Sequence, residues 1–310
     1  MRTIPITFAF DDNLILPACV CINSLLLNAS KSTFYDIYVL HSPETLRDRR
    51  MLSKIIEAYD RCRITYIEVN NYFNDGFEIR GITKATYYRL LIPHLISQYS
   101  KMIYADVDII FRMDLSSLYD INIEDVYLAA TYDIGMLLTE GGQKHIKKLG
   151  IEKDKYIQAG LLLINSHKIK EDGLDKRFFS LCKNNYKFQD QDILNLTCSK
   201  CHMCLPMKYN MTDYSFIFLR ERHEYFKNKT DEEITEALSF GNLHFNGHKP
   251  WKKYSLNFDI WWEYYRNSPV FDMDLYIDFY YSRLNIFDQL SLWKRVKILL
   301  RYFVYGKRKI

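Results

Sequence analysis

Short apolar runs alternate with longer amphipathic stretches through the first third of the chain. Three runs rich in β-branched and aromatic residues predict strands, and a fourth run leads directly into acidic residues. The segments between them have the length and the polar–apolar mixture of helices. This alternation predicts βαβ units and an α/β fold with a mostly parallel central sheet and helices on both faces. The predicted strands are residues 4–10, 35–40, 63–69 and 101–105, and the predicted helices are residues 17–27, 83–96 and a segment capped by Ser42 that runs to about Tyr59.

The second half of the chain adds fewer clear elements. An apolar run at residues 160–165 predicts a fully buried strand. Thr230 and Glu233 have the spacing of a capping box, which predicts the start of a short helix. No repeat, low-complexity stretch or flexible linker divides the chain. We therefore expect one large domain over residues 1–265 and a C-terminal helical, basic–aromatic extension over residues 266–310.

The C-terminal tail concentrates positive charge. Residues 293–310 contain seven Lys or Arg and no acid, whereas the net charge of all 310 residues is only +4. So small a net charge does not favour a nucleic-acid partner. Basic and apolar residues recur at helical spacing over residues 293–303, which is typical of a helix that lies in a membrane interface. The alternative is a solvated helix that docks on the domain.

The N-terminus does not have the pattern of a signal peptide. Its apolar run is short, is interrupted by Pro5 and ends at Asp11. No stretch approaches the roughly 18 continuous apolar residues of a membrane span. We therefore expect a cytoplasmic protein with reduced cysteines, held peripherally at the inner face of the cell membrane.

One group of cysteines has metal-like spacing. Cys198, Cys201 and Cys204 are separated by two residues each, and His202 lies among them. A structural zinc site usually takes four ligands in two pairs with a longer loop between them. Here three cysteines lie within seven residues and the chain has no second cluster of this kind, so the pattern does not favour a metal site, and the role of the three cysteines stays open.

Acidic residues follow the first and the fourth predicted strands. Ligands of open α/β sheets bind outside the carboxyl ends of the strands. Asp106 and Asp108 follow the fourth strand, and residues two apart in extended chain point the same way, so these carboxylates can converge on one cation. Two carboxylates suit Mg²⁺ or Mn²⁺, and an added imidazole favours Mn²⁺. Acids are common at strand ends, so this pair does not establish a site alone.

A second cluster of candidate residues lies near residue 245. It offers an imidazole, a glycine that permits close backbone approach and a lysine that can meet a phosphate. A core histidine beside a surface lysine is the plainer interpretation, but it does not explain five such residues within eight positions. Together with the two carboxylates the cluster predicts a metal–diphosphate site. Its members are His244, Gly247, Lys249, Pro250 and Trp251.

Three further motifs accompany these two, namely Phe8-Ala9-Phe10-Asp11-Asp12-Asn13, Tyr87-Tyr88-Arg89-Leu90 and Asp190-Gln191-Asp192. The five motifs and their order resemble those of the retaining glycosyltransferases of family 8, over roughly residues 4–265. That family includes bacterial lipooligosaccharide galactosyl- and glucosyltransferases and glycogenin. The resemblance implies a nucleotide-diphosphosugar transferase (GT-A type) fold, with a catalytic domain at residues 1–265 and an extension for membrane or acceptor attachment at 266–310.

The resemblance also implies an activity. It implies transfer of glucose or galactose from a UDP-hexose to a saccharide acceptor such as lipopolysaccharide or another surface glycan. The cofactor is Mn²⁺, or Mg²⁺ in its place, held by Asp106, Asp108 and His244. Four residues are implied to act at the donor sugar: Gln191 beneath the anomeric carbon, Asp190 on hydroxyls, and Asp133 and Arg89 beside them. The residues implied to contact the UDP-sugar are Ala9, Asp11, Asn13, Arg89, Asp106, Val107, Asp108, Gln158, Asp190, Gln191, His244, Gly247 and Lys249.

Three positions depart from the usual pattern of that family. Leu14 stands where an aromatic residue usually follows, so stacking on uracil should be weaker or come from elsewhere. The interval from His244 to Lys249 is one residue shorter, which makes His248 a candidate neighbour of phosphate. Gln158 replaces an Asn and lengthens the amide arm by one methylene, so we expect it to affect which sugar is accepted.

Two other functions are weighed against transfer. A metal-dependent phosphohydrolase would use Asp106 as its nucleophile, but such enzymes usually carry this motif at the first strand, followed by Thr or Val and a Gly. Here Ile109 and Ile110 follow instead. A non-catalytic sugar-nucleotide-binding module would not need Asp190 and Gln191. Both are present, which favours the transferase.

Overall fold

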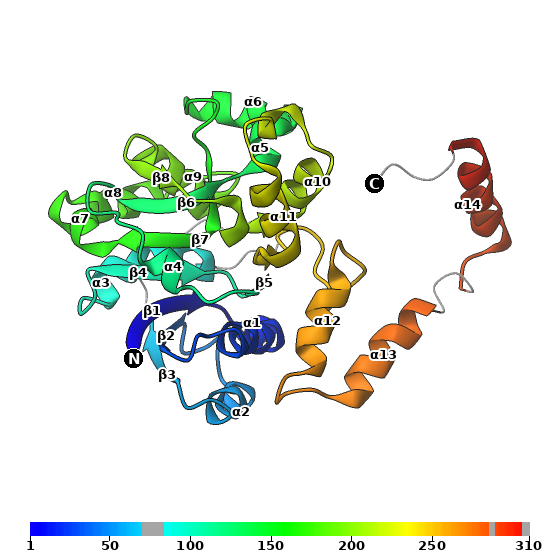
Figure 1. Cartoon of the computed structure of the whole chain (residues 1–310), viewed down its shortest axis with the longest axis horizontal. Helices are drawn as coiled ribbons and strands as arrows, with labels where there is room; N and C mark the ends of the chain where they lie inside the picture. The colour runs from blue at the N-terminus through cyan, green and yellow to red at the C-terminus, as the bar shows by residue number, and fades with distance from the viewer. Residues whose placement is uncertain (70–83, 285–288, 306–310) are drawn as a thin grey trace.

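The computed structural model describes residues 1–69, 84–284 and 289–305, and its centre is a seven-stranded sheet (Figure 1). The strand order is β3-β2-β1-β4-β7-β6-β8. The first four strands of this order run parallel, β7 is antiparallel to β4 and β6, and β8 is parallel to β6. The predicted mostly parallel sheet is confirmed. The strands are β1 (Arg2–Ala9), β2 (Thr33–His41), β3 (Cys62–Glu68), β4 (Lys101–Ala105), β6 (Leu128–Tyr132), β7 (Ile157–Asn165) and β8 (His202–Cys204).

Two hydrophobic cores lie on opposite faces of this sheet. Successive side chains of a strand point to opposite faces, so Ile103 packs in one core and its neighbour Tyr104 in the other. Helices α1 and α2 supply the first core, and α8 and α9 supply the second. The longer described helices are α1 (Ile15–Leu27), α2 (Arg50–Glu57), α6 (Glu140–Leu149), α8 (Leu174–Leu181), α9 (Gln189–Cys198), α10 (Asp213–Arg220), α11 (Asp231–Phe240), α12 (Phe258–Arg266), α13 (Met273–Leu284) and α14 (Leu292–Tyr305).

Shorter helical segments connect these elements. They include η2, a 3-10 helix that leads into α3 before β4, and α5, which follows β6. The short segments are η1 (Asp12–Leu14), η2 (Lys84–Leu91), α3 (Ile92–Leu95), α4 (Ser116–Tyr119), α5 (Ile134–Leu138), α7 (Ser166–Glu171), η3 (Met207–Tyr209) and η4 (Glu224–Phe226).

A second, smaller sheet joins distant parts of the chain. It contains β5 (Ile109–Ile110), β9 (Met211–Thr212) and β10 (Leu243–His244) in the order β5-β10-β9. β10 is antiparallel to β5 and parallel to β9. This sheet begins directly after Asp108, so it brings the segment around His244 to the carboxyl end of β4.

Most sequence-based boundaries agree with these elements, and one prediction is wrong. β4 has the predicted bounds, and Thr230 and Glu233 form the predicted capping box at α11. The segment that follows Ser42 is not a helix up to residue 49; α2 begins at Arg50. Tertiary contacts explain the difference, because the Asp12 carboxylate accepts the backbone N–H of Arg47 and ties this segment to the loop after β1.

The helix predicted at residues 83–96 is formed by two pieces. Residue 83 lies outside the described residues, η2 covers the first part as a 3-10 helix, and α3 completes it. Pro93 at the start of α3 donates no hydrogen bond to the preceding turn, so the break in helix type falls at a position where proline is tolerated.

The C-terminal helices differ in how they contact the domain. Trp262 of α12 is buried, and its ring contacts Tyr276, Phe279 and Tyr280 of α13, with the Phe279 ring centroid 4.4 Å away. Helix α14 lies apart from the sheet (Figure 1), and most of its described side chains are exposed, including 74% of Trp293. Among the described residues, the arrangement is therefore not that of a docked helix. The boundary between residues 265 and 266 stays a prediction.

A membrane span was not expected from the sequence. Of the helices in the described ranges, none is long and apolar enough to cross a bilayer.

Candidate active site

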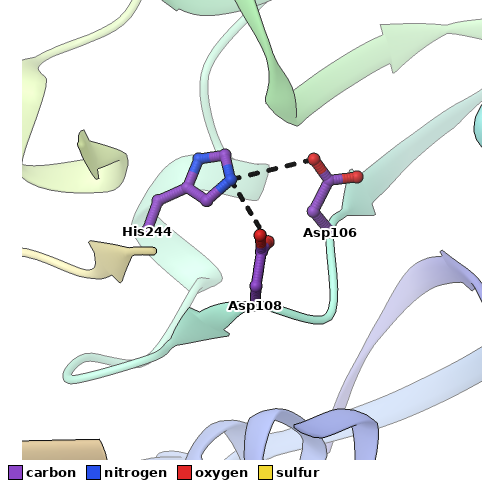
Figure 2. Close-up of side chains that lie close together, drawn as sticks. All are labelled: Asp106, Asp108 and His244. Atoms are coloured by element: carbon purple, nitrogen blue, oxygen red, sulfur yellow. Dashed lines mark ion pairs between the residues drawn. The ribbon is translucent and has the colours of Figure 1, made fainter. Parts of the chain in front are cut away.

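Asp106, Asp108 and His244 converge at the carboxyl end of β4 (Figure 2). His244 Nε2 lies 3.2 Å from Asp108 Oδ1 and 3.8 Å from Asp106 Oδ2. The carboxylates follow β4, and the imidazole comes from β10, where His244 pairs with Ile109 of β5. The predicted group of three residues is therefore assembled by the pairing of β5 with β10.

The donor atoms of this group fit a divalent cation. Asp108 Oδ1 is buried and has no hydrogen-bond partner among the described residues. One ligand atom from each residue lies within 4.8 Å of the others. Two carboxylates with one imidazole are a ligand set that suits Mn²⁺. The three residues form a candidate metal centre, in agreement with the prediction.

Lys249 forms an ion pair with Asp108. Its Nζ lies 2.5 Å from Asp108 Oδ2 and 2.7 Å from the Phe245 carbonyl oxygen. Burial would raise the pKa of Asp108, but the attraction of Lys249 and His244 outweighs it and holds that pKa well below its usual range. Asp108 is therefore ionised at neutral pH. Lys249 therefore lies against the Asp108 carboxylate, and its implied contact with the leaving phosphate stays a prediction.

Arg89 connects the Asp106 carboxylate to the Asp190 carboxylate. Its guanidinium is buried, donates to Asp106 Oδ1 at 2.9 Å and lies 2.9 Å from Asp190 Oδ2. It also donates to the Ala159 carbonyl oxygen at 2.6 Å and lies over the Tyr104 ring. Arg89 thus holds two acidic groups at fixed positions. Its implied contact with the donor stays a prediction.

Asp190 is almost fully buried in the first turn of α9. Burial raises its pKa to about 6, while Arg89 and a 2.5 Å hydrogen bond from the Thr86 hydroxyl oppose that rise. An acid with this pKa changes charge close to neutral pH. Thr86 was not predicted, because a single hydroxyl carries no sequence signal of its own.

Gln191 and Asp133 are joined by a hydrogen bond. Gln191 Nε2 donates to Asp133 Oδ2 at 3.1 Å, and Gln191 Oε1 accepts the Ala159 backbone N–H at 3.0 Å. Asp133 also caps α5 by accepting the backbone N–H of Met136. Burial raises the pKa of Asp133. The structure therefore brings together all four residues implied to act at the sugar: Gln191 contacts Asp133, Arg89 contacts Asp190, and the Ala159 backbone bonds both Gln191 and Arg89.

A fully buried acid fixes the start of α9. Asp192 accepts hydrogen bonds from Tyr156 Oη at 2.5 Å and from the backbone N–H of Phe188 at 3.0 Å, and His145 Nε2 lies 2.9 Å from it. Asp192 belongs to the motif that contains Asp190, but no separate role was predicted for it. Its contacts hold the turn that carries Asp190 and Gln191.

The predicted nucleotide-side residues follow β1 at the same edge of the sheet. Thr7 pairs with Tyr104, so the end of β1 lies level with the end of β4. Asp11 is buried and accepts the backbone N–H of Asn13, whose side chain is exposed, while Ala9 is half-buried. Their contact with a nucleotide stays a prediction.

The remaining predicted residues lie around the metal-side carboxylates. Val107 is buried between the two acids of its motif. Gly247 and His248 are exposed, and a Cβ added at Gly247 would lie 2.7 Å from Asp213 Oδ2. Asp213 was not predicted. It begins α10, and burial raises its pKa.

The cysteine group is not assembled as a metal site. Cys201 Sγ contacts the Asp125 carbonyl oxygen. Within the part of the chain that the structure describes, Asp106, Asp108 and His244 are the single group of three or more residues placed to hold a metal ion.

The sequence pattern of glycosyl transferase family 8 matches residues 5–255. The chain belongs to this family. A protein of Haemophilus influenzae, named as a glycosyltransferase, is 30% identical over 216 residues, which are 68% of this chain and 64% of that protein. The lipopolysaccharide 1,2-glucosyltransferase of Escherichia coli is 25% identical over 267 residues, covering 81% of this chain and 74% of the relative.

Solved structures agree with the family assignment at the level of the fold. The galactosyltransferase LgtC, in complex with donor and acceptor sugar analogs, matches with a TM-score of 0.71 and 23% identity over 87% of this chain and 98% of its own. The WbbM bifunctional glycosyltransferase also matches with a TM-score of 0.71, at 24% identity, over 88% of this chain and 51% of its own. The predicted GT-A type fold is confirmed.

The candidate metal centre depends on a glycine of β7. A Cβ added at Gly160 would lie 2.8 Å from His244 Nδ1 and closer still to Cε1. Gly160→Ala should therefore displace the imidazole and weaken Mn²⁺ binding about 10- to 100-fold. Overpacking should also cost about 1–3 kcal/mol of unfolding free energy. Electron paramagnetic resonance titration with Mn²⁺ and urea unfolding measure the two effects.

Gly141→Ala is the matched control, because a Cβ added at Gly141 meets nothing within 4 Å. It lies in α6 and should keep Mn²⁺ affinity while gaining up to about 1 kcal/mol from helix propensity. Equal Mn²⁺ affinities for Gly160→Ala and Gly141→Ala would contradict the placement of His244.

Proposed function

We propose that this family 8 protein is a retaining glycosyltransferase that transfers glucose or galactose from a UDP-sugar to a saccharide acceptor. The observation that carries the proposal is the convergence of Asp106, Asp108 and His244 beside Lys249 at the carboxyl end of β4. The name of the Escherichia coli relative supports lipopolysaccharide, or another surface glycan, as the acceptor.

The metal-side residues have the charges that a diphosphate leaving group requires. Asp106, Asp108 and His244 would hold Mn²⁺, or Mg²⁺ in its place. When bound, the cation stabilises negative charge that develops on the departing UDP. The Lys249 ammonium adds a fixed positive charge on the same side. The exposed backbone at Gly247 has no side chain to keep a phosphate away.

The sugar-side residues favour attack on the same face of the donor sugar. A carboxamide is a poor nucleophile, and Gln191 is held at both ends of its amide by Ala159 and Asp133. We therefore propose that Gln191 supports an oxocarbenium-like state without forming a lasting covalent bond. Asp190 would accept hydrogen bonds from donor hydroxyls, because its ionised oxygens are acceptors.

A phosphohydrolase mechanism is less compatible with the contacts of Asp106. Its Oδ1 accepts hydrogen bonds from Arg89 and Tyr104, and its Oδ2 faces His244. These contacts stabilise the carboxylate and lower its nucleophilicity. A binding module without catalysis would not explain why Asp190 and Gln191 are held so closely.

We also propose that α14 attaches the protein peripherally to the inner, cytoplasmic face of the cell membrane. Leu292, Val296, Leu299 and Phe303 recur at intervals of three or four residues and are exposed. Exposed basic residues form a stripe on the opposite face of the same helix. A helix with one apolar face and one basic face suits the interface of an anionic bilayer. The basic residues are Lys294, Lys297 and Arg301.

The metal centre gives the first test of the proposed activity. Asp106→Ala and Asp108→Ala should each reduce UDP release from UDP-glucose or UDP-galactose by about 100-fold or more while the fold is kept, because the diphosphate loses its neutralising partner. His244→Ala should reduce it less, since water can take a vacated ligand position. Calorimetric titration of UDP with and without Mn²⁺ measures the linkage. Equal UDP affinity without metal, or unchanged metal-linked affinity in Asp108→Ala, would contradict the proposal.

The pKa of Asp190 predicts how the activity decreases at acidic pH, which is the acidic limb of the pH–rate profile. Its pKa is about 6, and only the ionised form is a charged acceptor, so kcat/KM should fall as the pH decreases through about 6. Asp190→Asn should remove this limb and reduce turnover by about 100- to 1000-fold. Gln191→Ala is the control that keeps the limb and loses less activity. Persistence of the limb in Asp190→Asn would assign it to another group, and a stable glycosyl adduct on residue 191 would exclude the same-face mechanism.

The basic stripe of α14 predicts salt-dependent membrane binding. Replacing Lys294, Lys297 and Arg301 together by Gln should weaken binding to vesicles of phosphatidylserine and phosphatidylcholine. Each basic residue contributes about 1 kcal/mol near an anionic surface, so the loss should reach about 100-fold at low salt and shrink as salt increases. Vesicle co-sedimentation measures it.

A triple variant of exposed lysines in and near α6, Lys147, Lys148 and Lys153 to Gln, is the matched control for net charge. It should bind vesicles nearly as well as the unmodified chain. Both triple variants should keep UDP-sugar hydrolysis. Equal vesicle binding by the two variants would show that α14 is not the attachment surface.

A further inference from the structure

A chain of hydrogen bonds leads from the backbone of β7 to the imidazole of the metal centre. The backbone N–H of Gly160 donates to Gln158 Oε1 at 2.5 Å, and Asn210 Nδ2 donates to the same oxygen at 2.7 Å. Asn210 Oδ1 lies 3.0 Å from His244 Nδ1. The exposed fractions of Gln158, Asn210 and His244 are 5%, 1% and 2%, so each polar group depends on the next one for its partner.

The direction of every bond in this chain follows from its first member. A backbone N–H can only donate, so the Gln158 atom that faces Gly160 is the carboxamide oxygen. That oxygen can only accept, so Asn210 turns its NH₂ group toward Gln158 and its own oxygen toward His244. An amide oxygen cannot donate, so the proton between Asn210 and His244 lies on Nδ1 of the imidazole.

We propose that Gln158 and Asn210 are positioning residues that set the tautomer of His244. With the proton on Nδ1, a neutral imidazole has its lone pair on Nε2, the nitrogen that faces Asp106 and Asp108. A metal-ligating nitrogen must be unprotonated, and its partner nitrogen usually donates to a neighbouring acceptor. The opposite tautomer would direct an N–H at the cation position.

This inference gives Gln158 a role other than selection of the donor sugar. Its carboxamide oxygen already has two donors, Gly160 and Asn210. Gly160 helps to hold the Gln158 carboxamide in two ways. Its N–H donates to Gln158 Oε1, and its lack of a side chain leaves room for that oxygen, because an added Cβ would lie 2.9 Å from it. The inference rests on the proposed metal centre, but the tautomer is a property of the protein without metal.

Nuclear magnetic resonance of the metal-free chain, labelled with ¹⁵N in its histidines, tests the tautomer directly. At pH 8.5 the two ring nitrogens of neutral histidine have distinct shifts and couplings, and His244→Gln identifies the signals of residue 244. The expected result is a protonated Nδ1 and an unprotonated Nε2. A proton on Nε2 of neutral His244 in the unmodified chain would overturn the proposal.

Two substitutions at residue 158 separate hydrogen bonding from size. Gln158→Leu removes the acceptor and frees Asn210 to present its NH₂ group to Nδ1, which favours the Nε2–H tautomer. Gln158→Glu is the matched control, because it keeps an oxygen that accepts from Gly160 and Asn210. Affinity for Mn²⁺ alone should fall about 10- to 100-fold in Gln158→Leu. Gln158→Glu should keep the Nδ1–H tautomer and bind Mn²⁺ at least as well as the unmodified chain.

The outcomes distinguish this inference from the proposed function. A protonated Nδ1 in a chain that does not bind Mn²⁺ would support the positioning role and contradict the metal centre. Mn²⁺ binding with unchanged tautomer and affinity in Gln158→Leu would overturn the positioning role and leave the metal centre intact. Circular dichroism of each variant shows whether it folds, and the measurement on the unmodified chain decides the question even if a variant does not.

Discussion

The candidate site depends on one short backbone contact, the antiparallel pairing of β5 with β10. Only two residue pairs form it, Leu243 with Ile110 and His244 with Ile109, and the backbone N–H of Phe245 extends it by donating to the Asp108 carbonyl oxygen at 2.9 Å. The parallel sheet positions the carboxylates, but it has no strand that could carry the imidazole to them. The small sheet supplies that strand, and Lys249 follows four residues after Phe245, close enough to donate to both the Phe245 carbonyl and Asp108.

Charge balance links two parts of the site, the candidate metal ligands around Asp106 and Asp108 and the residues around Asp190 that are proposed to contact the sugar. Arg89 lies buried between Asp106 and Asp190, and Lys249 lies against Asp108. If His244 is neutral, the three carboxylates and the two basic side chains of this group have a net charge of −1. A bound divalent cation would change that net charge to +1. Removing one member of a buried ion pair leaves an uncompensated charge, so a substitution at Arg89 would disturb both sides together. The two sides are therefore not independent modules, although they lie on different segments.

The sequence predicted the parts of this protein that carry local signals. A short apolar run that leads into two acids predicted β4 with its bounds, and residue types in a fixed order predicted the candidate ligand set of Asp106, Asp108 and His244. The helix expected after Ser42 was wrong because a local capping pattern was outweighed by a tertiary contact from Asp12. Asn210 could not be predicted as the partner of His244, since β9 and β10 are too short to show any periodicity.

Aromatic packing connects the candidate site to the C-terminal helices. Trp262 Nε1 of α12 donates to the Pro250 carbonyl oxygen at 3.1 Å, directly after Lys249, and the Trp251 ring lies 5.4 Å from that of Trp261. On its other side Trp262 contacts the rings of α13, the last helix before α14. Trp262 therefore packs both on the loop that follows Lys249 and on α13, at the start of the predicted extension. Trp261 contacts both Trp262 and Trp251, so the two tryptophans of α12 and the Pro-Trp pair after Lys249 form one connection between the candidate site and the C-terminal helices.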